Sequence, residues 1–237
     1  MLSNPTAFIV STFFLLPGIA IAIPVHELGH AVAARLMGDR TPANRGYFGP
    51  GDPARYFTLY GALMMVFWRT GWGNRIPVNE QRFNDTGRRV LYELGGPVAN
   101  LLVALLFGLV FRSLGFIFDF VSFLQPAPLS YLAYIVYGIF FANLSVMAFN
   151  LLPIPGFDGW RIIEALFRRR NPRFFYSVSS QQLQIQQMLI LGLFVVQFIP
   201  AVGGNLLGLV MSPFYSPVAT LILGGCVGYL GLSPCLR

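Results

Sequence analysis

Residues 21–36 read IAIPVHELGHAVAARL, and this stretch decides the kind of fold that the rest of the sequence completes. It places two histidines and a glutamate inside an apolar run that extends from about Ala7 to Met37. A helix needs about 20 apolar residues to cross a bilayer, so the run is long enough to span. Ionisable side chains are costly at that depth and usually mark function. The stretch therefore predicts a membrane helix that carries chemistry.

The ionisable residues of this stretch form the pattern H-E-x-x-H, with His26, Glu27 and His30. Residues four apart share one face of a helix, so both imidazoles can bind one zinc ion. Glu27 stands beside them and can take a proton from a zinc-bound water. Random placement of the chain's two His and four Glu gives this pattern in about one of 7,000 sequences. We therefore predict His26 and His30 as metal ligands and Glu27 as a catalytic residue.

The composition indicates a membrane protein over the whole chain. Of the 237 residues, 55% are hydrophobic and 11% are charged, whereas soluble domains average about 25% charged residues. The net charge is +7, and all 16 basic residues are Arg, mostly in short loops beside apolar runs. This distribution follows the positive-inside rule and argues against nucleic-acid binding. We expect a single integral membrane domain over residues 1–237, in contact with the lipid bilayer.

The apolar runs predict an all-α polytopic membrane protein, with five to six transmembrane or re-entrant helices around a three-helix catalytic core. The runs cover about residues 7–37, 56–68, 88–111, 129–150, 188–210 and 214–231. A further helix is expected over Asp158–Phe167, and an interfacial segment over residues 181–187. Cys226 and Cys235 have no metal-ligand spacing and are expected to act as small apolar side chains.

A third metal ligand is needed, because catalytic zinc usually has three protein ligands and one open position. The chain has no third His and no Cys near the motif, so this ligand is expected to be Asp or Glu. Asp158 stands out because it lies in an apolar segment just after the break at Pro155-Gly156. Arg35 and Arg168 mark cytosolic helix ends by the positive-inside rule. At 1.5 Å per residue, all three ligands would lie about 8–15 Å below that surface.

Three motifs, taken in order, resemble those of the site-2 proteases, a family of zinc intramembrane metalloproteases. They are residues 26–30 (HELGH), 96–100 (GPVAN) and 150–159 (NLLPIPGFDG), and the resemblance covers about residues 15–170. It implies that Asp158 is the third zinc ligand and that Glu27 is the general base. It also implies that Asn150 helps to hold the substrate or the oxyanion, while Asn100 has more of a packing role.

The chain shows neither the PDZ-like insert nor the C-terminal regulatory domains of larger family members, so it resembles the compact form. We therefore expect a zinc-dependent intramembrane endopeptidase with one Zn²⁺ per chain. It would act in the cell membrane by regulated intramembrane proteolysis, with the active site nearer the cytosolic side. Its substrates would be membrane proteins or transmembrane peptides.

Two other classes of function are weighed against a protease. A catalytically silent membrane scaffold could retain the zinc site, but it would not require Glu27, whose structural tasks a Gln could perform. A transporter with a metal site near the midplane would usually show two similar halves with paired broken helices. The sequence has no such repeat. These arguments favour the protease.

The segment 56–80 departs from simple membrane helices. Its apolar part, residues 56–68, is too short to span, so the segment is expected to return to the cytosolic side that it left. Residues 72–79 (WGNRIPVN) are expected to be extended, because Gly, Asn and Pro interrupt helices. Two interpretations remain open: a strand that pairs with an unwound substrate by β-augmentation, or an ordinary interfacial loop.

Two further expectations concern side chains outside the motifs. Trp68 and Trp72 are expected to be interfacial anchors, as is common for Trp near membrane surfaces. Arg161 and Glu164 lie three residues apart and are expected to form a local ion pair.

Overall fold

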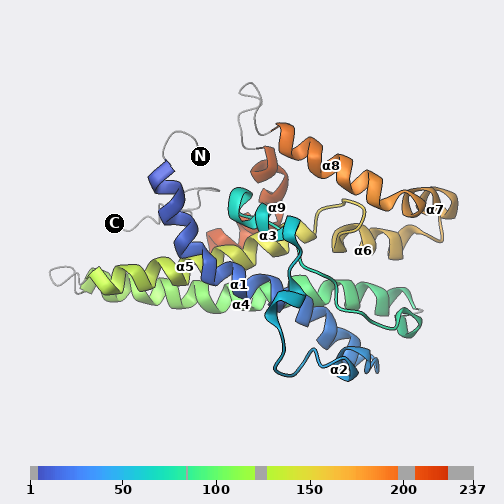
Figure 1. Cartoon of the computed structure of the whole chain (residues 1–237), viewed down its shortest axis with the longest axis horizontal. Helices are drawn as coiled ribbons and strands as arrows, with labels where there is room; N and C mark the ends of the chain where they lie inside the picture. Colours follow the sequence, from blue (N-terminus) through green and yellow to red (C-terminus); the bar gives the residue numbers. More distant parts are fainter. Residues whose placement is uncertain (1–4, 84, 121–126, 197–205, 224–237) are drawn as a thin grey trace.

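The structure is a computed structural model that describes residues 5–83, 85–120, 127–196 and 206–223. Its helices are α1 (Pro5–Leu36), α2 (Thr41–Asn44), α3 (Leu59–Trp68), α4 (Thr86–Phe120), α5 (Ala127–Asn150), α6 (Asp158–Phe167), α7 (Pro172–Ser180), α8 (Gln182–Val196) and α9 (Leu206–Leu223) (Figure 1). Two 3-10 turns, η1 (Pro53–Tyr56) and η2 (Glu80–Phe83), lie in the connections. Within these described ranges no strand forms beyond one isolated bridge, which confirms the all-α prediction.

Four helices are long and apolar enough to cross a membrane, and α3 is a shorter apolar helix. The four candidate spans are Phe8–Leu36, Thr86–Leu114, Tyr131–Asn150 and Leu206–Leu223. On α4, Leu102, Leu106 and Leu109 are each more than half exposed and follow one face of the helix. A row of exposed leucines is suited to lipid and unfavourable in water. Parts of the two apolar runs predicted after residue 188, together with Cys226 and Cys235, lie outside the described residues, and the predicted total of spans remains a prediction.

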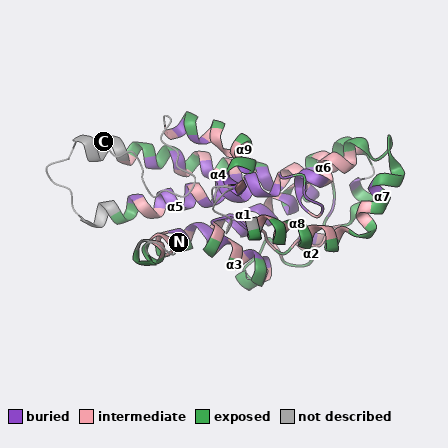
Figure 2. Ribbon diagram, turned by 90° about the horizontal axis from the view of Figure 1, so that it is seen from above, coloured by how far each residue is buried: buried purple, intermediate pink, exposed green. Residues whose placement is uncertain are grey.

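Three helices, α1, α4 and α5, pack against one another in the middle of the molecule (Figures 1 and 2). Glycines bring their backbones into close contact, which is a common way for membrane helices to associate. A Cβ atom on Gly18 would lie 2.4 Å from the carbonyl oxygen of Gly138 in α5. A Cβ atom on Gly29 would lie 2.4 Å from the carbonyl oxygen of Gly95 in α4. The second contact presses the H-E-x-x-H turn of α1 directly against the start of the second motif.

The segment between α2 and α4 leaves this bundle and returns to it. The side chain of Thr58 caps α3 by accepting a hydrogen bond from the Gly61 backbone N–H at 3.0 Å. At the other end Arg69 adopts a left-handed conformation, with φ of 62°, which ends α3 and reverses the chain. The returning limb meets the outgoing limb where the Asn74 N–H donates to the Tyr56 carbonyl at 2.8 Å. The segment is therefore an excursion whose two ends are hydrogen-bonded together.

Residues 72–79, beyond this turn, belong to no helix, and antiparallel pairing in the described chain is confined to one bridge between Phe57 and Gly73. The bridge supports an extended conformation at Gly73, while for the rest of residues 72–79, here called the extended limb, that conformation stays a prediction. Trp72, which is partly buried, packs against aromatic side chains, and its predicted role as an interfacial anchor stays a prediction. Its indole stacks on Phe149 at the end of α5, with ring centroids 6.0 Å apart, and also contacts Phe157 at 5.8 Å. These aromatic contacts fix the extended limb beside the third motif.

Candidate metal centre

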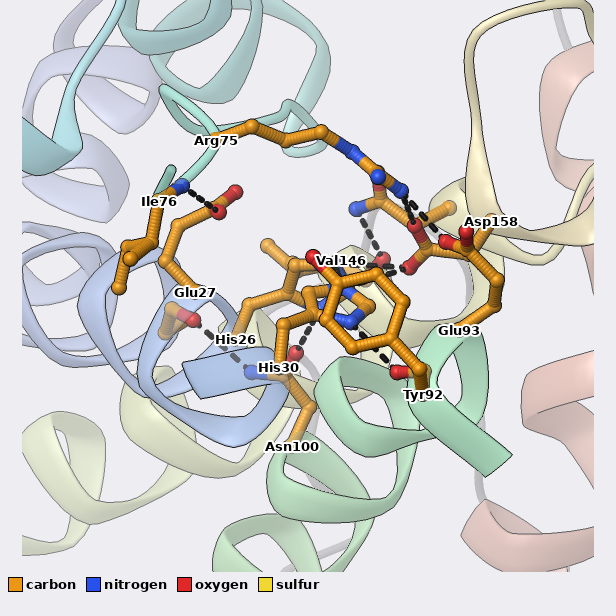
Figure 3. A network of polar contacts seen from close by, with 12 residues as sticks. His26, Glu27, His30, Arg75, Ile76, Tyr92, Glu93, Asn100, Val146 and Asp158 are labelled. Atoms are coloured by element: carbon orange, nitrogen blue, oxygen red, sulfur yellow. Dashed lines mark hydrogen bonds and ion pairs between the residues drawn. The ribbon is translucent and has the colours of Figure 1, made fainter. Parts of the chain in front are cut away.

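The three residues predicted as metal ligands converge on one point, although Asp158 is 128 residues away from His30 in the sequence. The Nε2 atoms of His26 and His30 lie 3.3 Å apart. Oδ2 of Asp158 lies 3.0 Å from the first nitrogen and 3.2 Å from the second. All three side chains are buried. The turn between α5 and α6 brings about this arrangement, because it sets Asp158 at the first position of α6, facing α1 (Figure 3).

This triangle has the dimensions of a zinc site. In tetrahedral coordination with bonds of about 2.1 Å, two ligand atoms lie about 3.4 Å apart. The three observed separations of 3.0 to 3.3 Å differ little from that value. Two neutral imidazoles and one carboxylate are also a donor set that zinc takes in catalytic sites, where a fourth position stays open. His26, His30 and Asp158 therefore fit zinc in both geometry and chemistry.

The remaining ring nitrogen of each histidine is also hydrogen-bonded. Nδ1 of His26 lies 2.7 Å from Oδ1 of Asn100, and Nδ1 of His30 lies 2.9 Å from the backbone carbonyl of Tyr92. Both acceptors require Nδ1 to carry the proton, which leaves each Nε2 lone pair free for a metal. Asn100 is itself held by donating to the carbonyl of Ala22 and to Oδ1 of Asn143, each at 2.9 Å. Asn100 therefore orients a ligand, in addition to the packing role expected for it.

Gly96 in α4 faces both imidazoles at close range. A Cβ atom at this position would lie 2.4 Å from Nε2 of His30 and 2.7 Å from Cε1 of His26. Real Cβ atoms essentially never come this close to another heavy atom. The first residue of the second motif is thus glycine because the rings occupy the space that any side chain would need.

Glu27 is buried next to the two histidines, and the returning limb of the 56–80 segment covers it. The backbone N–H of Ile76 donates to Oε2 of Glu27 at 3.3 Å (Figure 3). Gly73 lies against the same side chain, since a Cβ atom there would be 2.7 Å from Oε1. The extended limb therefore holds the carboxylate that the H-E-x-x-H pattern marks as catalytic.

An ion-pair network, absent from the sequence-based predictions, borders the ligand set. Nη2 of Arg75 lies 2.8 Å from Oδ1 of Asp158, the oxygen that points away from the histidines, and 2.7 Å from Oε2 of Glu93. Glu93 is fully buried in α4 and is also paired with Arg89 at 3.2 Å. The sequence could have marked Arg75 and Glu93 as candidates in one way only, because both are charged residues next to apolar segments. Their partners follow only from the packing.

Asn150, predicted to hold the substrate or the oxyanion, lies buried at the last position of α5. Its side-chain amide donates to the carbonyl of Val146 at 2.9 Å, one turn earlier in the same helix. The role proposed for Asn150 stays a prediction.

The chain is similar to several proteins that are named as zinc metalloproteases. Over 194 residues the chain is 32% identical to "Putative zinc metalloprotease Rip2" of Mycobacterium tuberculosis strain Erdman, a match of 79% of this chain and 70% of the relative. The protein of the same name in strain H37Rv is 34% identical over 72% of this chain and 63% of its own length. "Putative zinc metalloprotease YwhC" of Bacillus subtilis strain 168 is 33% identical over 65% of this chain and 68% of its own length.

No family model and no solved structure matches the chain. The chain nevertheless covers more than two thirds of two of these relatives, Rip2 of strain Erdman and YwhC, at over 30% identity, and four of its helices are apolar enough to cross a membrane. With the buried His-His-Asp cluster, these findings identify the chain as a membrane-bound zinc metalloprotease that belongs to the site-2 protease family.

Proposed function

We propose that this metalloprotease hydrolyses a peptide bond of substrates embedded in the membrane, with His26, His30 and Asp158 holding one zinc ion per chain. The observation that carries the proposal is the burial of this cluster among apolar helices. An ionisable cluster at such a position is costly unless it serves a function. A substrate can reach this cluster only from within the bilayer, and a helical substrate has to unwind there before it is cut. We take residues 1–237 to be one catalytic domain.

The proposed chemistry divides the work between the metal and the chain. When bound, zinc supplies a Lewis acid that makes water a stronger acid and polarises the scissile carbonyl. Glu27 takes the proton from the attacking water and passes it to the leaving amine. The hydrogen bond from Ile76 keeps the Glu27 carboxylate in one orientation for both steps. Asn150 would contact the substrate or the oxyanion after giving up its bond to Val146.

The proposed location is the cell membrane, with the active site nearer the cytosolic side. Arginines support this orientation, because they gather at the helix ends on the side of the metal centre. They include Arg35 at the end of α1, Arg88 and Arg89 at the start of α4, and Arg168–Arg170 after α6. Short loops rich in Arg face the cytosol by the positive-inside rule.

We further propose that residues 72–79 pair with an unwound substrate. A helical substrate shields its peptide bonds with its own hydrogen bonds, and freed backbone groups are costly in lipid. The extended limb crosses directly over Glu27, so its backbone could accept such a substrate beside the metal. Val78→Pro is the cleaner test, because Ile76 already donates its N–H to Glu27. Unchanged cleavage by Val78→Pro, with zinc retained, would favour the interfacial-loop interpretation.

Glu27→Gln tests the proposed function as a whole. This variant keeps the size of the side chain and the three metal ligands, so it should retain about one zinc per chain. Cleavage of a membrane-embedded substrate in reconstituted vesicles should fall at least about 100-fold, the lower range for general acid–base catalysis. Near-normal turnover would exclude the role of Glu27.

The control for this experiment is a His30→Ala, Asp158→Ala double variant, which should lose both zinc and cleavage. The alternative of a silent scaffold predicts instead that the wild type and Glu27→Gln are equally inactive on every membrane substrate tested. The intact Glu27 and the metalloprotease names of the relatives disfavour it.

A further inference from the structure

A cavity of about 400 Å³ that is lined by several charged side chains lies between the start of α4, the end of α6 and the start of α7. Its charged lining consists of Arg89, Arg161, Arg168, Arg169, Asp85 and Glu164. Four guanidinium groups and two carboxylates give it a formal charge of +2. None of its lining residues is a predicted metal ligand, and neither Glu27 nor Asn150 lines it.

The two carboxylates of the cavity are already engaged. Asp85 accepts backbone hydrogen bonds from Gly87 at 2.9 Å and Arg88 at 3.3 Å, at the start of α4. Glu164 accepts a hydrogen bond from the Ser179 hydroxyl at 3.0 Å and lies 3.6 Å from Nη1 of Arg168. These contacts use the acidic groups for local structure and leave an excess of positive charge in the cavity.

Arg161 carries the clearest signal for an anion-binding role. The predicted ion pair between Arg161 and Glu164 is not formed, since Glu164 pairs with Arg168 one helical turn further on. No described carboxylate lies within ion-pair distance of Arg161, and its Nε is buried without a hydrogen-bond partner. A guanidinium that is partly removed from water is costly without a counter-charge, and an unsatisfied buried donor calls for a ligand.

Arg169 supplies a second guanidinium that has no carboxylate partner in the described part of the chain. Its side chain is exposed, so it can close over a ligand from the solvent side of the cavity. Several guanidinium groups that converge from separate elements are a common arrangement for binding phosphate, because each presents a fork of N–H donors.

We propose that this cavity binds the phosphate of an anionic phospholipid headgroup. Its place in the fold favours lipid as the source of the phosphate, since the cavity lies where α4 begins and α6 ends, among the arginines expected at the cytosolic surface. Basic pockets at this level of a membrane protein are suited to phosphate headgroups. The site goes beyond the proposed protease activity, and its test requires no cleavage.

Binding is measured on the full-length, zinc-loaded protein in detergent micelles. The probes are short-chain phosphatidylglycerol, phosphatidylcholine with the same acyl chains, and inorganic phosphate. The cavity variant is Arg161→Gln, Arg169→Gln. The matched control is Arg170→Gln, Arg173→Gln, which removes the same charge from the same end of the molecule at two positions that do not line the cavity.

The wild type should bind the anionic lipid at least about tenfold more tightly than the zwitterionic lipid, and inorganic phosphate should compete. This preference should fall to within about twofold in the cavity variant and persist in the control, since each charge-assisted hydrogen bond contributes about a factor of ten. Arg169→Gln alone should give an intermediate preference for the anionic lipid. Because Arg169 is exposed, this single variant can be tested even if the double variant unfolds.

Three results would overturn the proposal. Equal losses in the cavity variant and the control would mean that general surface charge attracts the lipid. Stabilisation by inorganic phosphate without any lipid preference would assign the cavity to a free anion. Binding of an acidic peptide in place of either phosphate probe would assign it to a protein segment. Repeating the measurement on Glu27→Gln separates these outcomes from any failure of the proposed function.

Discussion

Gly96→Ala adds one methyl group to α4 at the point where this helix faces both imidazoles. The new Cβ atom would lie 2.4 Å from Nε2 of His30 and 2.7 to 2.8 Å from two ring atoms of His26. Ordinary contact begins near 3.4 Å, so the rings or the helix must move by about 0.6 to 1.0 Å. Zinc–ligand distances tolerate about 0.2 Å. The methyl group therefore displaces two ligands by several times the tolerated amount.

The expected loss of zinc affinity follows from this displacement. Changing one hydrogen-bond partner behind a ligand costs about 10- to 100-fold in affinity. Moving two ligands directly should cost at least the upper figure, about 100-fold, or about 2.7 kcal/mol. The effect on an ordinary helix position has the opposite sign, because replacing Gly by Ala in a helix stabilises it by about 0.5–1 kcal/mol. A general change in helix propensity cannot imitate the result.

Zinc affinity would be measured by competition with a chelating dye, on protein purified in detergent, with the melting temperature recorded in parallel. Gly192→Ala is the matched control, because a Cβ atom on this α8 glycine would meet nothing within 4 Å. The control should bind zinc like the wild type. If Gly96→Ala is folded and binds zinc within about threefold of the wild type, the close contact between α4 and the imidazoles is wrong.

Three further changes test the surroundings of the metal. Asn100→Ala should weaken zinc binding about 10- to 100-fold without unfolding the protein, as a competition titration would show. Arg75→Met removes one of the two guanidinium partners of the fully buried Glu93 and should lower the free energy of unfolding by about 2–3 kcal/mol, below or at the low end of the usual range for a buried pair, because Arg89 remains and Arg75 is partly exposed. Burial alone would raise the pKa of Asp39, but hydrogen bonds from Thr41 and Asn79 hold it below its usual value. The stability contributed by Asp39 is therefore present above about pH 4 and lost as the pH falls further, so melting temperatures should drop less for Asp39→Asn than for the wild type between pH 6 and pH 3.

Several sequence-based predictions concern local features, and these agree with the structure. The spacing of His26 and His30 is enough to put both on one helix face, whatever surrounds them. Asp158 could be singled out because a carboxylate in an apolar segment after a Pro-Gly break has few structural uses. The limits of α5 follow from the apolar run that ends at Asn150.

One prediction failed because two partners compete for one side chain. Arg161 and Glu164 are suitably spaced for an ion pair, but Arg168 and Ser179 offer Glu164 better-placed contacts once α7 folds back on α6. Local spacing cannot rank such alternatives, because the competing partner is brought in by another helix.

The sequence by itself determined which helices are apolar enough for a membrane, that His26 and His30 share one face of an H-E-x-x-H helix where a metal is predicted, and which family the chain resembles. These properties depend on residue type and short-range spacing. Apolar runs in lipid have to form helices, and helix geometry then fixes which nearby residues share a face. The tertiary structure alone decided that Asn100 orients His26, that Gly96 makes room for both imidazoles, and that Ile76 holds Glu27. These contacts join residues 49 to 74 positions apart, so they exist only after α1, α4 and the extended limb have packed together.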